Sequence, residues 1–234
     1  MSVKLYYDLL SQPSRSLFIF FKKAQVPFEA CLVNLGKGEH LKKEYLENVS
    51  RIPKVPVVHD GDFRLNESVG IVRYISRQYP VADNLYPKDS KKQALVDEYL
   101  EWHHLNVRVN CSTYFIKTTY PFYQWLNPMK TGRQPSEEEV RKAKKYMEKS
   151  LQDFQNYFLS NGKFINGDQI SYADIHAACE IEQTRVAGYD VRDRFPKIKE
   201  WIEAVREECN PHYDRAHQFV NLISQKEEEP KSKL

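Results

Sequence analysis

Two hydroxyl side chains, Ser11 and Ser14, bracket Gln-Pro in the segment DLLSQPSRSL. Their spacing is that of a redox Cys-x-x-Cys motif, but both cysteine positions hold serine. Ser11 lies between an expected strand and an expected helix, and with Pro13 in the first turn its simplest role is that of a helix cap. The start of a buried helix also carries free N–H groups and partial positive charge, so a hydroxyl there can donate a hydrogen bond to an anion such as a thiolate. The two roles do not exclude one another.

Two other chemistries are not favoured by the sequence. A nucleophilic Ser11 needs a base and an orienting acid; His40 and Asp8 are present, but nothing ties them to Ser11, and the G-x-S-x-G pattern of hydrolases is absent. His103 and His104 are adjacent in an expected helix, so their side chains point in different directions. Because no second ligand pair stands at metal-binding spacing, we expect no metal site.

The segment KVPV, Lys54 to Val57, places a proline at the entry to a strand. Proline is tolerated at the start of a strand, and the Val55-Pro56 bond can be cis. A cis bond would turn the backbone of Val55 toward a cleft, where its N–H and C=O could hold a peptide-like ligand as an added strand does. A plain rigid turn also fits these residues, and the sequence does not separate the two.

The segment Asn66-Glu67-Ser68 begins another helix, which Asn66 is expected to cap. Ser68 and its N–H would face an anion at that helix start, and Glu67 could accept a hydrogen bond from an ammonium group. Taken alone, the segment is better explained by capping and dipole compensation. His40 and Lys54 flank the same region and could meet a carboxylate, although each alone is typical of a solvated surface residue.

All these residues fall at the same end of a small α/β fold. Together they offer a hydroxyl for a thiol, a strand-like backbone for a peptide, a helix start with an acid for an amino-acid end, and two cations for a carboxylate. The set matches glutathione, which has a γ-glutamyl end, a peptide middle, a free thiol and a glycine carboxylate.

The elements that must position these residues follow from hydrophobic periodicity. The helix at 14–24 is apolar nearly all round, so it should be buried, and Asp60-Gly61 marks a hairpin turn. The expected order is β-α-β-α-β-β-α, with strands at 3–8 and 28–35 and in a hairpin at 55–65, and helices at 14–24, 38–49 and 66–79.

The remainder of the chain has helical periodicity throughout, so the class changes from α/β to all-α. We expect one long, bent helix from Ser90 to about Tyr120, a loop over 119–136, a second long helix from Ser136, and three more helices ending near Gln225. The predicted organisation is an α/β domain at 1–82, a linker at 83–90, an all-helical domain at 91–225 and a charged, disordered tail at 226–234.

Composition sets the broad class. The 234 residues include 35 basic and 32 acidic side chains, well interspersed, so neither nucleic acid nor a membrane surface is indicated as a partner. The chain has no apolar run near the ~20 residues that a membrane span needs and does not start like a secretory signal. Four widely separated cysteines suit a reducing compartment.

Six segments carry a resemblance to a known family. LYYDLLSQPSRS, VNLGKGEHL, KVPVVHDGDF, NESVGIVRYI, VDEYLEWHH and ISYADI resemble, in order and spacing, segments of the theta class of cytosolic glutathione transferases, over about residues 3 to 225. The resemblance implies a thioredoxin-like N-terminal domain, a helical second domain, a homodimer and a cytoplasmic location. It implies no cofactor, with glutathione as co-substrate and a small electrophile as second substrate.

The resemblance also implies roles for individual residues. Ser11 would activate the glutathione thiol, and Ser171 with Asp174 in ISYADI would form a capping box that serves folding. The residues implied to bind glutathione are His40, Lys54, Val55, Glu67, Ser68 and Arg108. An aromatic-rich segment could line a second-substrate pocket or pack in the core; it comprises Trp102, Tyr114, Phe115, Tyr120, Phe122, Tyr123 and Trp125.

Three questions stay open at this stage. The implied electrophiles are small halides, epoxides, hydroperoxides or activated alkyl compounds, and reduction of organic hydroperoxides is an alternative to conjugation. A non-catalytic binding or assembly module with the same fold is the rival hypothesis, which the intact Ser11 disfavours. The terminal tripeptide Ser232-Lys233-Leu234 matches the address read by the peroxisomal import receptor, which predicts a peroxisomal fraction.

Overall fold

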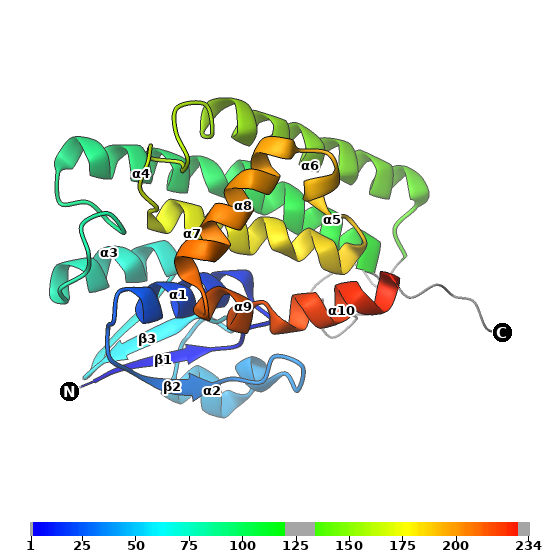
Figure 1. Ribbon diagram of the computed structural model, residues 1–234. Helices are drawn as coiled ribbons and strands as arrows, with labels where there is room; N and C mark the ends of the chain where they lie inside the picture. The colour runs from blue at the N-terminus through cyan, green and yellow to red at the C-terminus, as the bar shows by residue number, and fades with distance from the viewer. Residues whose placement is uncertain (1, 120–133, 229–234) are drawn as a thin grey trace.

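The N-terminal part of the computed structural model is a four-stranded sheet with helices on both faces (Figure 1). The structure describes residues 2–119 and 134–228. The expected β-α-β-α-β-β-α order is confirmed, with a 3₁₀ turn added at Glu39–Leu41. The elements are β1 (Val3–Tyr7), α1 (Gln12–Lys23), β2 (Phe28–Leu32), α2 (Lys43–Asn48), β3 (Val57–Asp60), β4 (Phe63–Asn66) and α3 (Ser68–Gln78).

The strands are ordered β2-β1-β3-β4, with β1 parallel to β2 and the other two pairs antiparallel. Successive side chains of a strand point to opposite faces of the sheet, so the sheet has two apolar faces. Leu5 pairs with Val58 on one face, and Tyr6 pairs with Val57 on the other. The face with Leu5 packs on α1 and α3, while the opposite face packs on α2 through Tyr45. The sheet is therefore covered on both sides, and α1 lies between it and the helical part (Figure 1).

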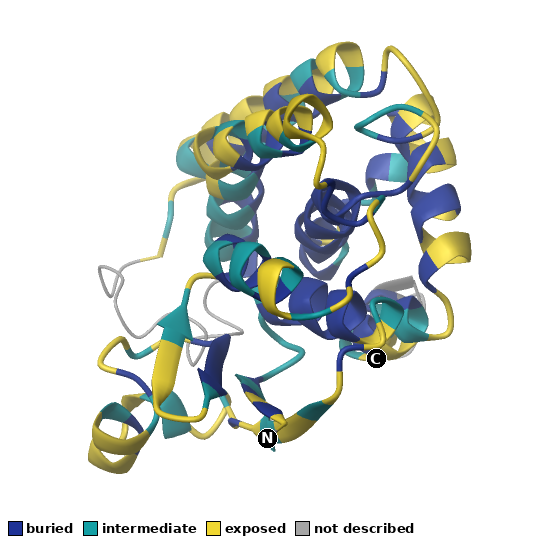
Figure 2. Ribbon diagram, turned by 90° about the vertical axis from the view of Figure 1, so that its left-hand side faces the viewer, coloured by how far each residue is buried: buried dark blue, intermediate teal, exposed yellow. Residues whose placement is uncertain are grey.

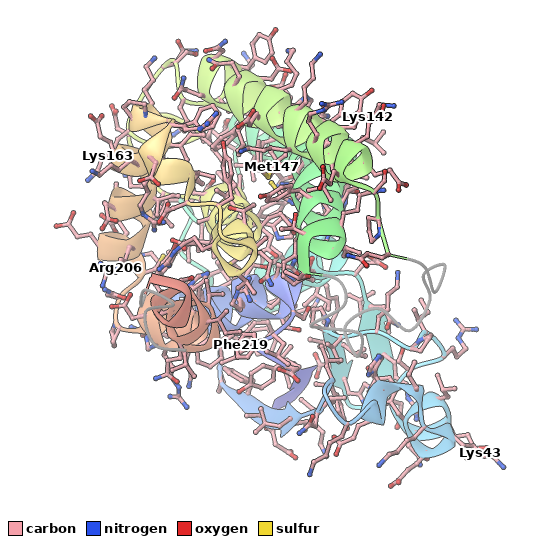
Figure 3. The ribbon with its side chains drawn as sticks, turned by 90° about the vertical axis from the view of Figure 1, so that its right-hand side faces the viewer. Lys43, Lys142, Met147, Lys163, Arg206 and Phe219 are labelled. Carbon is pink, nitrogen blue, oxygen red and sulfur yellow. The ribbon has the colours of Figure 1, made fainter. Side chains whose placement is uncertain are left out.

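The C-terminal part consists of helices stacked above α1 and α3 (Figure 1). On α6, Met147 points inward and Lys142 outward (Figure 3), as an amphipathic helix requires. Helix α7 is buried on all sides at the centre of this part (Figure 2). The helices are α4 (Ser90–His103), α5 (Val109–Thr119), α6 (Glu137–Tyr157), α7 (Tyr172–Ile181), α8 (Pro196–Cys209), α9 (His212–Ala216) and α10 (Gln218–Glu228).

Several details of the predicted elements were wrong. The single helix expected from Ser90 is interrupted by a π-helical turn at His104–Arg108, which is how the bend is made. The region after α6 contains four α-helices, where three were expected. It also contains 3₁₀ turns at Glu182–Ala187 and Val191–Asp193. Asn66 does not cap α3: it ends β4, and its side-chain oxygen accepts a 2.7 Å hydrogen bond from Ser50.

The predicted linker belongs to the core. Leu85 and Tyr86, and Val81 just before the linker, are buried in the same apolar cluster as residues of both flanking parts, and Leu85 O accepts a 2.8 Å hydrogen bond from the N–H of Tyr172. The domain boundaries therefore remain predictions, based on the change along the sequence from an α/β to an all-α pattern. No helix within residues 2–119 and 134–228 is long and apolar enough to cross a membrane.

A buried cation joins the two parts of the chain. Arg15 on α1 is fully buried, and its guanidinium donates to the backbone oxygens of Leu9, at 3.0 Å, and Cys179, at 2.9 Å. It also donates to the side-chain oxygen of Gln183 at 2.7 Å. Its Nε has no hydrogen-bond partner among the described residues, so the two terminal nitrogens make these bonds. Because a buried charge needs hydrogen-bond partners, the bonds fix α1 against α7 and the turn that follows it.

Asp174 stabilises the start of α7, as the sequence predicted for a folding role. Its carboxylate accepts hydrogen bonds from the N–H and the hydroxyl of Ser171, at 2.9 and 3.0 Å. It also accepts from the N–H of Ile165 at 2.8 Å and from the indole of Trp201 at 2.9 Å. The side chain is completely buried. Burial raises its pKa, whereas the four hydrogen bonds lower it.

We predict that Asp174→Asn lowers the free energy of unfolding by about 3 kcal/mol, because the amide keeps the shape but cannot accept all four bonds. Urea denaturation followed by far-UV circular dichroism measures the change. Asp62→Asn, in an exposed turn, is the matched control and should change stability by less than about 0.5 kcal/mol. Equal midpoints for the two variants would contradict the assigned role.

Candidate functional site

A cavity of about 470 Å³ lies between the ends of the sheet elements and the helical part. All seven residues singled out from the sequence line it: Ser11, His40, Lys54, Val55, Glu67, Ser68 and Arg108. They come from segments up to 97 positions apart, Ser11 and Arg108 being the extremes. The fold therefore assembles one site from residues that the sequence could place only at the same end of a domain.

Ser11 caps α1 as a hydrogen-bond acceptor, and its hydroxyl donates no hydrogen bond to any residue that the structure describes. Its side-chain oxygen accepts the N–H of Ser14 at 3.4 Å, and its own N–H donates to Asp8 O at 3.0 Å. The Asp8 carboxylate holds the surrounding loop by accepting the N–H groups of Leu10 and Leu35, both at 2.9 Å. Because the cap uses Ser11 as an acceptor, its O–H can donate into the cavity, where the start of α1 adds partial positive charge.

The Val55-Pro56 peptide bond is cis. Within the described residues, neither the N–H nor the C=O of Val55 bonds to another backbone group. The preceding carbonyl, Lys54 O, is fixed by a 2.6 Å hydrogen bond from the Tyr45 hydroxyl. The backbone of Val55 can therefore bond to an extended ligand lying along the cavity.

Glu67 has an unusual backbone, with φ 67° and ψ 112°. It occupies the N-cap position of α3 without making a side-chain cap, which differs from the capping role considered for this segment. A non-glycine residue at positive φ is strained by about 1–3 kcal/mol. The conformation presents the Ser68 N–H, at the first position of α3, to the cavity.

His40 and Lys54 lie on the wall formed by the loops after β2 and before β3. His40 is in the 3₁₀ turn, and its Nδ1 is buried without a partner. Burial lowers the pKa of His40, and the Asp8 carboxylate partly opposes this shift. The Lys54 side chain is exposed, so it can reach a carboxylate at the cavity mouth.

The helical wall of the cavity was mostly missed by sequence reasoning. The π-helical turn brings His104 and Arg108 into the cavity, and α7 with the following turn contributes the others, namely His176, Glu180 and Gln183. Arg108 forms an ion pair with Glu180, which is 2% exposed. The second oxygen of Glu180 is buried without a partner, and burial raises the pKa of this carboxyl despite the guanidinium.

One signal could have located part of this wall. Polar side chains recur at positions 172, 176 and 180 of α7 and at 183 in the 3₁₀ turn that follows it, which is the spacing of one helix face. Such a polar stripe on an otherwise apolar helix indicates a buried polar site. The π-helical turn left no comparable pattern, because the periodicity on either side of it remains helical.

Of the three described aromatic residues of the aromatic-rich segment, one lines the cavity and two pack in the core. Phe115 lines the cavity together with Ile116, whereas Trp102 packs on Tyr99 and Phe158 within the helical part. Tyr114 is buried beside Tyr189. The other four lie outside the described residues: Tyr120, Phe122, Tyr123 and Trp125. No group of three or more histidine, cysteine or acidic side chains in the described part of the chain could hold a metal ion.

Comparison with known proteins identifies relatives over nearly the whole chain. The family model "Glutathione S-transferase, N-terminal domain" matches residues 1–77, and "Glutathione S-transferase, C-terminal domain" matches residues 113–208. Glutathione S-transferase theta-1 of Gallus gallus is 36% identical, covering 96% of this chain and 91% of the relative. Theta-2 of Rattus norvegicus is 38% identical over 88% of this chain and 81% of the relative.

Solved structures agree with the sequence comparison. Human glutathione S-transferase T1-1 in its apo form superposes with a TM-score of 0.85 at 35% identity, covering 96% of this chain and 91% of that one. Human theta-2 in complex with glutathione and an unknown ligand also gives 0.85, at 34% identity, with coverage of 96% and 90%. A human theta-class enzyme holding the glutathione conjugate of 1-menaphthyl sulfate gives 0.82 at 33% identity, with coverage of 97% and 92%.

The strain at Glu67 gives a prediction that does not depend on any ligand. Glu67→Gly and Glu67→Ala both remove the carboxylate, but only glycine adopts positive φ without steric cost. We expect the glycine variant to be more stable than the alanine variant by about 1–2 kcal/mol in urea denaturation. Equal stability would show that the backbone at this position is not strained.

Proposed function

Because the chain belongs to the glutathione S-transferase family and is similar over nearly its whole length to the theta class, we propose that it conjugates glutathione to small electrophiles. The observation that supports this function best is the convergence of three features in one cavity. These are the donor hydroxyl of Ser11, the open backbone of Val55 and the N-terminus of α3 at Ser68.

Each part of glutathione has a partner in the proposed arrangement. The γ-glutamyl carboxylate meets the N–H and hydroxyl of Ser68, and Glu67 accepts from the ammonium group. The peptide middle bonds to the backbone of Val55, and His40 and Lys54 face the glycine carboxylate. This orientation places the thiol beside Ser11.

Ser11 would then lower the pKa of the glutathione thiol. A free thiol with pKa near ~8.5 is only a few per cent thiolate at neutral pH. The Ser11 O–H donates to the sulfur and, with the positive end of α1, favours the charged form, and each unit of lowered pKa corresponds to about 1.4 kcal/mol. The thiolate attacks the electrophile, a sulfur–carbon bond forms, and the leaving group departs toward the helical wall with Arg108, His104 and Phe115.

The rival hypothesis of a non-catalytic module predicts binding without activation. It is disfavoured because Ser11 acts as an acceptor in the cap and donates to none of the described residues, which supports a proton available for the sulfur. Reduction of organic hydroperoxides by the same thiolate is included in the proposal, because the cavity does not limit the electrophile to carbon centres.

Assembly and location complete the proposal. A homodimer is proposed from the family relationship, and exposed apolar side chains at Leu105 and Val109 supply surface that a second copy could cover. Light scattering after size-exclusion chromatography measures the oligomeric state.

We also propose a cytoplasmic protein with a peroxisomal fraction delivered through Ser232-Lys233-Leu234, which lie outside the described residues. Removing the tripeptide from a fluorescent fusion should abolish peroxisomal fluorescence.

We predict that Ser11→Ala raises the thiol pKa of bound glutathione by about 1–2 units, because the alanine cannot donate to the sulfur. Thiolate absorbance of the complex, titrated with pH, measures the value. The wild type should show a pKa below that of free glutathione. Turnover at neutral pH should fall about 10- to 100-fold in the variant, while glutathione still binds.

Ser14→Ala is the matched control, since this neighbouring serine is buried and its hydroxyl has no partner. It should leave the thiol pKa unchanged. Bound glutathione with an unshifted pKa in the wild type would favour the non-catalytic module, and absence of glutathione binding would refute the proposed function.

A further inference from the structure

Gln183 lines the cavity with an amide group that is held from behind by a buried cation. It lies in the 3₁₀ turn Glu182–Ala187 that follows α7, and the residue is 3% exposed. The proposed mechanism gives Gln183 no role. Its contacts show which end of the amide is available to a ligand.

Arg15 decides the orientation of this amide. The Nη2 atom of Arg15 lies 2.7 Å from Oε1 of Gln183, and a guanidinium can only donate hydrogen bonds. The amide oxygen must therefore face Arg15, so the amide nitrogen is directed away from it. Chemistry thus fixes the oxygen and nitrogen positions, which the shape of an amide alone does not.

The amide nitrogen of Gln183 is open to the cavity. It donates to no residue within 2–119 and 134–228, and it is not among the enclosed polar atoms that lack a partner. The free oxygen of Glu180 differs in this respect, because it is enclosed. A ligand in the cavity can therefore accept a hydrogen bond from the Gln183 amide.

The buried cation also strengthens this donor. Arg15 is 0% exposed, so a ligand in the cavity does not touch its guanidinium. A hydrogen bond from a cation to the amide oxygen polarises the amide and makes its N–H groups more positive. Gln183 can therefore present part of the buried charge to the cavity.

His176 stands on the same wall as a hydrogen-bond acceptor. Ser16 donates to Pro13 O at 2.9 Å, so the 3.0 Å contact between Ser16 Oγ and the Tyr172 hydroxyl uses the tyrosine proton. Both hydroxyl oxygens then accept from Nδ1 of His176, at 3.1 and 3.3 Å. Burial lowers the pKa of His176 to about 3, so its Nε2 carries no proton at neutral pH. Neither His176 nor the amide of Gln183 can transfer a proton to a substrate.

A fixed donor that keeps its proton suits one kind of electrophile. It stabilises an oxygen that gains negative charge in the transition state and remains bonded to carbon. An oxygen that leaves as an alkoxide, or that is freed by opening an epoxide, also needs a proton. An enolate oxygen needs none, because the enolate takes up its proton at carbon from water.

We propose that Gln183 is a specificity-determining residue whose amide N–H donates a hydrogen bond to the carbonyl oxygen of an α,β-unsaturated carbonyl compound as that oxygen becomes an enolate. The inference rests on the proposed function, since it needs the glutathione thiolate as the attacking group. It deepens that function by naming a class of second substrate.

The addition balances without any further reagent. The thiolate sulfur attacks the β-carbon and a sulfur–carbon bond forms. The electron pair of the carbon–carbon double bond shifts, which places the negative charge on the carbonyl oxygen. The α-carbon then takes up a proton equivalent to the one that the thiol released, and the carbonyl group is restored. Gln183 keeps its protons throughout.

The test compares two electrophiles that share a styryl group, in variants of the full chain. The ketone trans-4-phenyl-3-buten-2-one has a carbonyl oxygen, whereas cinnamyl chloride has a halide and no oxygen. Gln183→Glu keeps an oxygen for Arg15 and replaces the amide nitrogen with an oxygen that cannot donate. We expect kcat/KM to fall about 100-fold for the ketone and less than about 3-fold for the chloride.

Gln183→Met removes the donor without adding charge and should give the same selective loss. Gln152→Glu is the matched control, because this glutamine is exposed on α6 and does not line the cavity, so the ratio of the two activities should not change. Equal losses for both electrophiles in the Gln183 variants, or no loss for the ketone, would overturn the inference. A selective loss in Gln183→Glu alone would assign the effect to the added charge and would also overturn it.

The proposed function and this inference fail in different ways. A wild type that lowers the thiol pKa and consumes cinnamyl chloride but not the ketone keeps the proposed function and loses the inference. A wild type that binds glutathione without activating it loses both.

Discussion

The contact between α1 and α7 depends on one buried cation. The Arg15 guanidinium bonds on one side to the backbone of Leu9, two residues before Ser11, and on the other side to Cys179 O and the side chain of Gln183. Burial lowers the pKa of Arg15, while these acceptors and two nearby carboxylates favour its charged form. The same interaction that joins the sheet part to the helical part therefore fixes the loop carrying Ser11 relative to the helical wall.

Helix α7 acts as the common wall because three of its polar side chains find partners on other elements. Asp174 fixes its N-terminus to Trp201 of α8, His176 meets Ser16 of α1, and Glu180 pairs with Arg108 of the π-helical turn. Each pair crosses between elements, so the helix cannot shift or rotate without exposing a buried polar group to an apolar surrounding. Rigidity at the site thus comes from the same hydrogen bonds that fold the helical part. The π-helical turn is an irregular feature of this wall, and Arg108, its last residue, reaches Glu180 of α7.

The sequence predicted the half of the site that is built by local rules. Ser11, Val55 and Ser68 stand at a helix start, before a proline and at a second helix start, and these positions have chemical meaning without a structure. The helical wall could not be derived this way. The partner of Arg108 is Glu180, 72 residues away, and only packing brings them together. The cap at Asn66 was wrong for a related reason: the Ser50 hydroxyl competes for that side chain, and tertiary contact overrides the local preference. The π-helical turn between α4 and α5 was not predicted, because the apolar spacing on either side of it remains helical.

A serine at position 11 makes chemical sense when the chain's own thiols are considered. A hydroxyl forms no mixed disulfide, so sulfur chemistry at this site is confined to the ligand. Cys179 lies on α7 next to Glu180, which lines the cavity, yet it is completely buried and burial raises its pKa far above the ordinary range. Burial likewise raises the pKa of Cys111 and brings that of Cys209 to about 12. None of these three thiols is a competent nucleophile at neutral pH, because the thiolate is the reactive form. The packing that buries Cys179 on α7 therefore also keeps this thiol in its unreactive form beside the cavity wall.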